Sequence, residues 1–439
     1  MLDDLLGGRT VRIGVTGLAR AGKTAFLTSL AANLLAAGAG LPSLPTLAKR
    51  LGGRRLSVRL APARADAIPR FDPAPPLAAL AADPPSWPAR TGAVSLLAFD
   101  VEVARSGVLP LPPRRLRLEL LDYPGEWLLD LPLLQTGFDA WSAATLRRLE
   151  SQPGARDFLA FATALPGGAG RDEAVATTGY RLYRAALGRL RDDGFAFLQP
   201  GRFLMPAPGP EPPWMQFFPL RGVGQLAALM NERYDAYVDA VRRDIVSPLF
   251  GDLDRLVVLA DLLSALHAGP DSFADAQAAL AAASAALRWE WSWTDALEAL
   301  RNLRLPPRVI RRVAYAATKA DHVAERQRGN LAALMASLAP GGAQPTAHFA
   351  LAAIRCTEDV SMTLDGRSVS AVRGRTADGA LVRSYPGEVP NRPPDAAFWT
   401  HPFFQLPEFE PTRLASGGRA GVPQLNMDAV LAFLLDDLL

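Results

Sequence analysis

The chain has 439 residues, 49% hydrophobic and 21% charged, so it is long enough to bury one large core or several smaller ones. A formal charge of only +3 argues against wholesale nucleic-acid binding. The single cysteine, Cys356, excludes a disulfide scaffold and a cysteine-cluster zinc site, and four histidines disfavour a His-rich metal site. We see no leader-like segment before the first strand and no apolar run of membrane-spanning length, so we expect a soluble, cytoplasmic protein.

Lysine is rare in this sequence. Only three of the 47 basic residues are Lys, at Lys23, Lys49 and Lys319, which leaves 44 Arg. A compact ammonium fits where a planar guanidinium cannot. Lysines kept in so Arg-rich a chain therefore indicate positions that need an ammonium, and two of the three lie in recognisable motifs.

The first predicted elements are a buried strand at 11–16 and a helix over 25–37, with a complete GxxxxGKT motif, Gly17–Thr24, between them. Strand, Gly-rich turn and helix form the context in which this motif holds phosphates on backbone N–H groups and on the helix dipole. Lys23 is expected to reach the β- and γ-phosphates and the Thr24 hydroxyl to ligate Mg²⁺. The alternative is a Gly-rich turn before a buried helix. The nucleotide contacts predicted from this segment come from Gly17, Arg20, Ala21, Gly22, Lys23, Thr24 and Ala25.

A Pro/Ala/Arg-rich stretch follows, at about residues 41–92. Proline at this density favours extended, mobile segments. The stretch is the expected place of switch I, whose Thr closes on Mg²⁺ when the γ-phosphate is bound. Thr91, just before a predicted strand at 93–103, is the best-placed metal ligand of this kind.

An acidic element comes next, where a predicted strand at 114–121 ends in Asp122-Tyr123-Pro124-Gly125-Glu126. An acid at the carboxyl end of a strand is where a P-loop protein holds Mg²⁺, usually through water. Gly125 is placed to bring its N–H to the γ-phosphate. The alternative is an ordinary Pro-Gly turn after a strand.

Two residues are candidates for assisting the attack of water. Glu126 follows the glycine directly, where many GTPases place the residue that orients water, and a carboxylate can also accept a proton. Arg20 lies on the phosphate loop and is either an internal arginine finger or the partner of a carboxylate. Glu126, Arg20 and Lys23 are therefore the predicted catalytic residues, and a solvated switch-loop acid is the alternative for Glu126.

Helical patterns at 172–191 and 224–246 predict a helical insertion at about 139–252. Its aromatic residues are expected to form a core rather than a ligand platform. A buried strand at 256–261 and a packed helix at 273–287 follow, and Asp261 at the end of this strand is interpreted as structural.

A base-reading loop is predicted at Thr318-Lys319-Ala320-Asp321, which follows a strand and resembles the NKxD loop of GTPases. Asp321 would accept both the N1–H and the N2–H of guanine, a contact that adenine cannot offer. Thr318 stands where Asn is usual and keeps a polar tether, while the Lys319 stem would lie along the base. The alternative is a strand end with solvated charges. A further predicted strand, 347–353, leads to Ile354, whose backbone N–H is our choice for the contact with guanine O6.

The remainder of the chain predicts a hairpin and a terminal helix. Segments 368–375 and 380–383 flank Asp378-Gly379, a typical hairpin turn. The amphipathic helix at 426–439 is expected to bury its apolar face in the core, with membrane or partner contact as the alternative.

The motifs GLARAGKT, LLDYPGEWLLDLPLL (Leu120–Leu134), TKAD and PGEVP (Pro386–Pro390) resemble those of the YcjX-type P-loop GTPases of bacteria. The resemblance spans most of the chain. It implies a Ras-like sheet with a helical insertion, binding of GTP with Mg²⁺, and an association with envelope stress.

We therefore expect an α/β P-loop NTPase fold, a Ras-like GTPase sheet flanked by helices with a large helical insertion. The expected divisions are 1–138 and 253–380 for the two halves of the GTPase domain, 139–252 for the insertion and 381–439 for a C-terminal extension. The expected function is a Mg²⁺-dependent GTP-hydrolysing switch with slow intrinsic turnover, GTP and GDP as ligands, a protein partner or activator, no nucleic acid, and peripheral contact with the inner membrane. Two alternatives stay open: a scaffold that binds GTP with little hydrolysis and acts through its insertion, and an ATPase, which Asp321 disfavours.

Overall fold

The computed structural model describes residues 9–62, 68–89, 94–105, 112–206, 209, 211–246, 253–287, 310–342, 344–400 and 404–438. The chain divides into two compact units. The first comprises Met1–Tyr123, Leu253–Phe273 and Val309–Leu439, and the second comprises Pro124–Asp252 and Ala274–Arg308. The second unit thus begins upstream of the boundary expected at residue 139, and the segment expected as a C-terminal extension belongs to the first unit.

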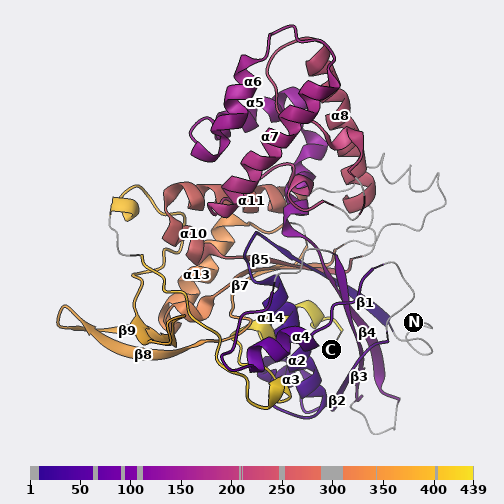
Figure 1. The fold of residues 1–439 in the computed structure, drawn as a ribbon. Helices are drawn as coiled ribbons and strands as arrows, with labels where there is room; N and C mark the ends of the chain where they lie inside the picture. The colour runs from indigo at the N-terminus through magenta and orange to yellow at the C-terminus, as the bar shows by residue number, and fades with distance from the viewer. Residues whose placement is uncertain are drawn as a thin grey trace. The chain divides into compact units, whose positions relative to one another are not determined.

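The described residues of the first unit form a seven-stranded sheet in the order β2-β3-β4-β1-β5-β6-β7 (Figure 1). Strands β4, β1, β5, β6 and β7 run parallel, whereas β3 is antiparallel to both β4 and β2. The bounds are β1 Arg9–Gly17, β2 Leu56–Leu60, β3 Ser95–Val103, β4 Arg114–Asp122, β5 Arg255–Ala260, β6 Arg312–Ala317 and β7 Thr346–Ala350. This is the α/β architecture expected from the sequence.

The strands that sequence predicts best are the buried central ones. All six residues of β5 are buried, and apolar residues dominate the middle of β1 and the second half of β4. Continuous apolar runs of this length are typical of strands covered on both faces. The sequence analysis missed β2, because only one of its five residues is buried and its apolar pattern is too short to stand out.

Three helices of the first unit pack into one apolar core with the sheet: α2 Lys23–Gly38, α3 Pro45–Leu51 and α14 Met427–Leu435. Leu30 and Leu34 of α2, Leu47 of α3, and Val430 and Leu434 of α14 all belong to it. The expectation that the terminal helix buries its apolar face is therefore confirmed. No helix in the described ranges is both long and apolar enough to span a bilayer.

The expectation of an extended, mobile stretch at 41–92 is wrong for the part that the structure describes. That part contains α3, β2 and the helix α4 Ala74–Ala81. Pro45 opens α3, and Pro75 and Pro76 lie in the first turn of α4. Proline is tolerated in a first helical turn because the N–H that it lacks has no partner within the helix there. Three of the prolines in this stretch therefore lie at the starts of helices rather than in extended chain.

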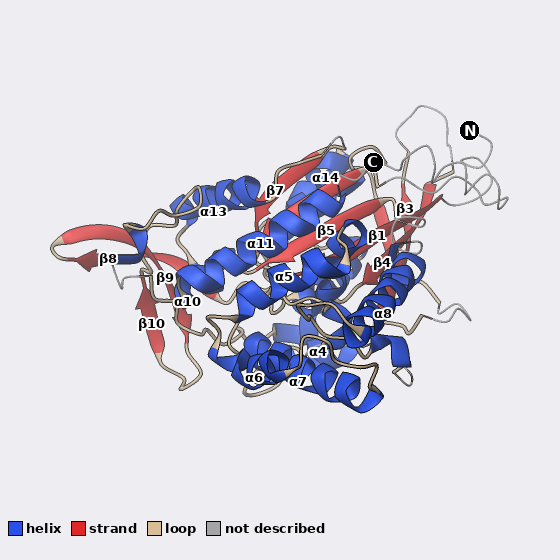
Figure 2. Cartoon of the chain, turned by 90° about the horizontal axis from the view of Figure 1, so that it is seen from above, coloured by secondary structure: helices blue, strands red, loops and turns tan. Residues whose placement is uncertain are grey.

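The remaining elements of the first unit are a small sheet and two further helices. β8 Thr357–Leu364, β9 Arg367–Arg375 and β10 Leu381–Ser384 form an antiparallel sheet in the order β10-β9-β8. The predicted hairpin is confirmed as β9 and β10, whereas β8 was missed because most of its residues are exposed and polar. Helix α10, Leu262–Ala268, follows β5, and α13, Glu325–Leu338, packs alongside β7 (Figure 2). Helix α11, Pro270–Leu287, begins in the first unit and continues in the second.

The second unit is helical, as expected. Its main helices are η1 Gly125–Gln135 (a 3₁₀ helix), α5 Phe138–Leu149, α6 Arg156–Ala164, α7 Glu173–Asp192 and α8 Gln225–Val241, which a short π-helix, Arg242–Val246, extends. Aromatic rings meet edge-to-face in its interior, as Trp141 and Phe217 do at 5.5 Å between ring centroids. Trp141, Tyr183, Phe217, Tyr234 and Tyr237 are fully buried, which confirms the prediction of an aromatic core.

A buried carboxylate fixes η1 within the second unit. Asp130 is fully buried and accepts hydrogen bonds from the Gly201 N–H at 2.7 Å, the Arg202 N–H at 3.3 Å and the Tyr237 hydroxyl at 2.6 Å. Burial raises the pKa of Asp130 to about 6, although these donors favour the ionised form. The 3₁₀ helix that starts at Gly125 is thus held in place by one titratable carboxylate.

A buried cation fixes α14 on the sheet. Arg255 of β5 has a fully buried side chain that donates to the Leu434 carbonyl at 2.9 Å and to both carboxylate oxygens of Asp437 at 2.8 and 2.7 Å. Its neighbour Asp436 is 37% exposed; it pairs with the exposed Arg50 at 3.0 Å and, more distantly, with Arg312 at 3.7 Å. The two adjacent acids therefore offer a matched comparison.

We predict that Asp437→Ala lowers the free energy of unfolding by about 2 kcal/mol or more, because it removes the carboxylate that is hydrogen-bonded to the buried guanidinium. Asp436→Ala, the control, should lower it by less than about 1 kcal/mol, since exposed pairs contribute little. Urea unfolding followed by far-ultraviolet circular dichroism measures both values. Equal losses in the two variants would contradict a special role of the Arg255 pair.

We predict that Asp130 makes stability depend on pH. Its folded pKa of about 6 lies above the ordinary value of 3.8, so the unfolded chain releases this proton first as pH rises. The free energy of unfolding should fall by about 3 kcal/mol between about pH 4 and pH 6 from this group alone. Urea unfolding at a series of pH values should show that slope flattened in Asp130→Asn. The exposed Asp139 supplies the control, Asp139→Asn, and the idea fails if both variants keep the wild-type slope.

Candidate functional site

Loops leave the carboxyl ends of β4, β1, β5, β6 and β7 at one edge of the sheet. Backbone hydrogen bonds tie four of these loops to the end of a neighbouring strand. In each, a backbone N–H of the loop donates to a backbone carbonyl of the strand. The pairs are Tyr123 to Val15 (3.0 Å), Leu18 to Leu259 (2.9 Å), Thr318 to Ala260 (2.9 Å) and Leu351 to Ala317 (2.8 Å). Ligands of open α/β sheets bind at this edge.

The phosphate loop departs from β1 in the middle of the sheet. A Cβ at Gly17 would lie 2.3 Å from the Leu259 carbonyl oxygen, so only glycine fits there. Gly22 has a φ of 79° and directly precedes Lys23, the first residue of α2. Glycine has no side chain to cap the helix, and the first turn of a helix is where N–H groups can bind an anion.

Arg20 lies in this loop, between the end of β1 and Gly22. It is exposed and has a φ of 62°, a left-handed conformation that is uncommon for residues other than glycine. Strained backbone of this kind clusters at binding loops. Its assignment as an internal arginine finger stays a prediction.

Asp122 ends β4 beside the phosphate loop. In register it lies opposite Val15 of β1, two residues before Gly17, and opposite Ser95 of β3. The residue is 2% exposed. A carboxylate here and the Thr24 hydroxyl at the start of α2 are the oxygen donors that Mg²⁺ prefers, so the donor set fits this ion. Thr91, the third predicted ligand, lies outside the described residues.

Gly125 and Glu126 begin η1 and belong to the second unit. Glu126 is half-buried, and its carbonyl oxygen would lie 1.9 Å from a Cβ at Gly201, which makes that glycine necessary. The predicted contacts of these two residues, with the γ-phosphate and with the attacking water, stay predictions.

The T-K-x-D loop leaves β6. The Thr318 hydroxyl contacts the Ala260 carbonyl at 3.3 Å, which supplies a polar tether to the adjacent strand. Lys319 has a φ of 59°, and its ammonium lies 2.6 Å from Asp261 Oδ2 and 3.0 Å from Ser264 Oγ. The lysine is therefore held by α10, while its side chain remains 40% exposed.

Asp261 is a site residue whose partner the sequence analysis missed. Its carboxylate accepts from the Ser264 N–H at 3.0 Å and the Ser264 hydroxyl at 2.6 Å, and so caps α10. The pattern Asp-x-x-Ser after a buried strand was a local signal for the cap. The ion pair with Lys319 joins loops that are far apart in sequence, and no local pattern indicated it.

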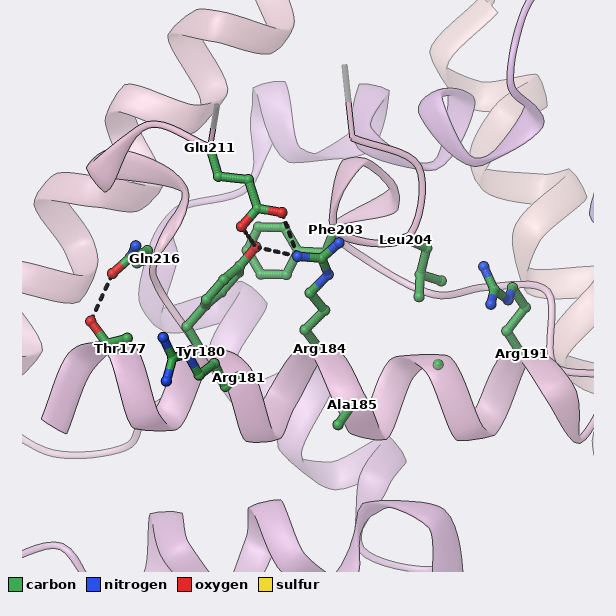
Figure 3. A pocket seen from close by; sticks show the side chains of 11 residues that line it. Thr177, Tyr180, Arg181, Arg184, Ala185, Arg191, Phe203, Leu204, Glu211 and Gln216 are labelled. Atoms are coloured by element: carbon green, nitrogen blue, oxygen red, sulfur yellow. Dashed lines mark hydrogen bonds and ion pairs between the residues drawn. The ribbon is translucent and has the colours of Figure 1, made fainter. Parts of the chain in front are cut away.

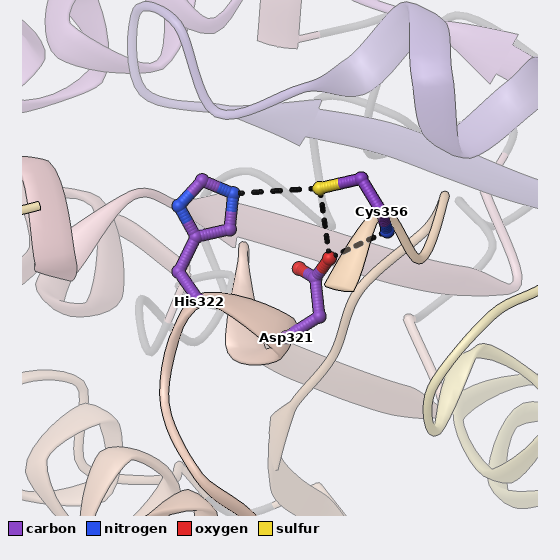
Figure 4. Close-up of side chains that lie close together, drawn as sticks. All are labelled: Asp321, His322 and Cys356. Atoms are coloured by element: carbon purple, nitrogen blue, oxygen red, sulfur yellow. Dashed lines mark hydrogen bonds between the residues drawn. The ribbon is translucent and has the colours of Figure 1, made fainter. Parts of the chain in front are cut away.

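Asp321 lies in a buried cluster with His322 and Cys356 (Figure 4). Asp321 Oδ2 accepts the Cys356 N–H at 2.8 Å and lies 3.1 Å from its Sγ. The His322 Nε2 is 3.9 Å from the same sulfur, and the Thr357 hydroxyl donates to the Asp321 carbonyl. Burial lowers the pKa of His322 and raises the pKa of Cys356. The sequence analysis used Cys356 only as a composition argument.

Ile354 lies in the bend that follows β7. Its side chain is buried in a small apolar cluster with Ala32 of α2, Leu80 of α4, Leu414 and Val422. This packing fixes the loop, whose backbone N–H is predicted to contact guanine O6.

The second unit contains an open groove of about 490 Å³ along α7 (Figure 3). Arg184 and the Tyr180 hydroxyl both contact the Glu211 carboxylate there, so Glu211 neutralises the charge of Arg184. None of the residues predicted from the motifs lines this groove. We therefore place the candidate site at the edge of the sheet.

Comparison with known proteins identifies the family of the chain. The model of the YcjX-like family, DUF463, matches residues 11–439. A protein of Escherichia coli (strain K12) named Ras-like GTPase YcjX is 34% identical, over 98% of this chain and 96% of its own. A protein of the same name from Shewanella oneidensis (strain MR-1) is 31% identical, over 98% and 94%. The resemblance inferred from the motifs is thus confirmed, and the chain belongs to the YcjX-like family.

Proposed function

We propose that this protein is a Mg²⁺-dependent GTPase that acts as a molecular switch. The observation that carries the proposal is the placement of the loops. A GxxxxGKT loop, a strand-end acid and a T-K-x-D loop leave parallel strands at one edge of a single sheet. The names of the two relatives, Ras-like GTPase, support the same activity.

The phosphates of GTP would be held by the loop after β1. Backbone N–H groups of Gly17–Thr24 and Ala25 surround the phosphates, and Lys23 reaches the β- and γ-oxygens. The Thr24 hydroxyl and Asp122 would hold Mg²⁺, which neutralises charge on those oxygens. Thr91 would complete the metal site from switch I.

The base would be read by the loop after β6. Asp321 accepts the N1–H and N2–H of guanine, and adenine, which lacks this pair of donors, is rejected. Cys356 fixes the orientation of the carboxylate through Oδ2. Thr318 tethers the loop, the Lys319 stem covers the base, and the Ile354 N–H meets guanine O6.

Hydrolysis would use three further groups of the chain. The Gly125 N–H contacts the γ-phosphate, Glu126 orients the attacking water, and Arg20 stabilises charge that develops on the transferred group. Neither Glu126 nor Arg20 is a Gln-type water positioner, so intrinsic turnover is slow and a partner accelerates it. The bacterial stress response is part of the proposal through the family resemblance. Peripheral contact with the inner membrane is the alternative interpretation of the terminal helix, whose apolar face packs in the core.

Asp321→Asn tests the base-reading loop. The Asn carbonyl can still accept the Cys356 N–H, so the fold is preserved, but the charge that guanine requires is lost. Affinity for a fluorescent GTP analogue should fall about 30- to 100-fold, the worth of one or two charge-assisted hydrogen bonds. Affinity for a fluorescent ATP analogue should not change.

Xanthosine triphosphate supplies the positive control, because it carries an oxygen acceptor where guanine carries its amino group. It should bind Asp321→Asn better than GTP does. Equal binding of GTP and ATP to the wild-type protein would sink the GTPase assignment and leave only the phosphate loop.

Glu126→Ala and Arg20→Ala test the hydrolytic step. Steady-state phosphate release at saturating GTP should fall at least tenfold in each, with nucleotide affinity within about threefold of wild type. Glu150→Gln, which removes an exposed charge in the second unit, is the control and should keep the wild-type rate. Unchanged turnover in both test variants would favour the alternative, a scaffold gated by GTP, and fast wild-type turnover would contradict the need for a partner.

A further inference from the structure

The cluster of Asp321, His322 and Cys356 has a chemistry that guanine recognition does not use (Figure 4). A carboxylate oxygen, an imidazole nitrogen and a sulfur lie within 4.8 Å of one another. The three residues are 1%, 8% and 6% exposed. They come from two loops, one after β6 and one after β7, so the fold brings the three donors together.

The spacing of the donor atoms matches a tetrahedral metal. With Zn–S near 2.3 Å and Zn–N or Zn–O near 2.0 Å, the edges of a tetrahedral site are about 3.5 Å long. The observed Sγ–Oδ2 and Sγ–Nε2 distances are 3.1 and 3.9 Å, on either side of that value. The Sγ–Oδ2 and Sγ–Nε2 distances each differ from the tetrahedral edge by about 0.4 Å, and all three donor atoms lie within 4.8 Å of one another.

We propose that Asp321, His322 and Cys356 form a binding site for Zn²⁺, and that bound Zn²⁺ excludes guanine nucleotides. Binding releases the thiol proton to solvent, since the thiolate is the ligand. Thiolate, carboxylate and Zn²⁺ then sum to zero charge, which suits a buried position where a net charge is expensive. Mg²⁺ is not a competitor, because it prefers an octahedron of oxygen ligands.

The surroundings support the donors in this arrangement. The rings of Phe409 and His322 pack in an edge-to-face arrangement, with 5.1 Å between their centroids. Phe409, Val372 and Cys356 share a small apolar cluster. The Cys356 N–H holds the Asp321 carboxylate from the side. An apolar shell and a hydrogen bond to a ligand are the features that orient metal donors in other proteins.

The regulatory consequence rests on the proposed function. A carboxylate that ligates Zn²⁺ cannot accept both guanine N–H groups, so metal and nucleotide compete for Asp321. Zn²⁺ would therefore keep the protein in a nucleotide-free state, whatever the concentration of Mg²⁺.

Cobalt substitution tests the site directly on the full-length protein. Co²⁺ added to nucleotide-free wild type should give a sulfur-to-cobalt charge-transfer band in the near ultraviolet and visible bands of tetrahedral intensity, both removed by Zn²⁺. Cys356 is the only cysteine of the chain, so this band can come from no other residue. Cys356→Ser should abolish it, and His322→Gln should weaken Co²⁺ binding at least tenfold. His267→Gln, which changes an exposed histidine of α10, should bind as wild type does.

Two outcomes would overturn the site: no charge-transfer band in the wild type, or full Co²⁺ affinity in His322→Gln. The competition is measured separately, as the fall in affinity for fluorescent GTP on addition of stoichiometric Zn²⁺. We expect at least a tenfold fall in wild type and none in Cys356→Ser, and an equal fall in both would overturn the competition. If wild type gives the cobalt band but never binds GTP, the proposed function fails and the metal site stands.

Discussion

The site depends on one feature of the parallel sheet: its hydrogen-bond ladder runs past the strands into the loops. The first residue after β1 and the first after β4, β6 and β7 each donate to the end of a neighbouring strand. These backbone hydrogen bonds at the carboxyl ends of the strands fix the position of the first residue of each loop. Residues more than 300 positions apart in sequence, such as Gly17 and Ile354, therefore belong to loops that start at the same edge. The side chains have only to point away from the sheet to meet a common ligand.

Sequence patterns predicted the parts of this arrangement that are local. The GxxxxGKT loop was recognisable because Gly17 and Gly22 meet backbone demands, close approach and positive φ, that only certain residues satisfy. The buried strands β1, β4 and β5 were recognisable because their apolar runs are continuous. Edge strands such as β2 and β8 carry no such run, since solvent covers much of them. The Pro-rich stretch misled because proline has two opposite meanings, as a breaker inside a helix and as a starter at its first turn.

The non-local parts could not be predicted, for a physical reason. The ion pair of Lys319 with Asp261 and the contact of Asp321 with Cys356 join loops after different strands. Only the order of strands in the sheet decides which loops become neighbours, and sequence spacing does not reveal that order. Asp321 could thus be assigned to the base, as a prediction, from its motif, whereas its buried contact with Cys356 could not be predicted.

The DYPGEW segment links the two units through covalent continuity. Tyr123 is bound to β1 in the first unit, and the next residue, Pro124, begins the second. Within the second unit the Trp127 indole donates to the Met205 carbonyl at 3.0 Å, and Asp130 is fixed by three donors. Asp122, the predicted metal ligand, therefore lies only a few residues along the chain from these anchors.

The placement of the lysines supports the proposed nucleotide site by an argument that is separate from the motifs. In a chain that uses Arg at 44 of 47 basic positions, Lys319 has its ammonium within 3.0 Å of both a carboxylate and a hydroxyl oxygen. A single nitrogen can donate to both oxygens while its aliphatic stem stays extended, whereas a guanidinium spreads its donors over a rigid plane. In the proposed function, Lys23 likewise places a point charge on the β- and γ-phosphates at the start of α2. A compact ammonium suits both of these roles better than a planar guanidinium does.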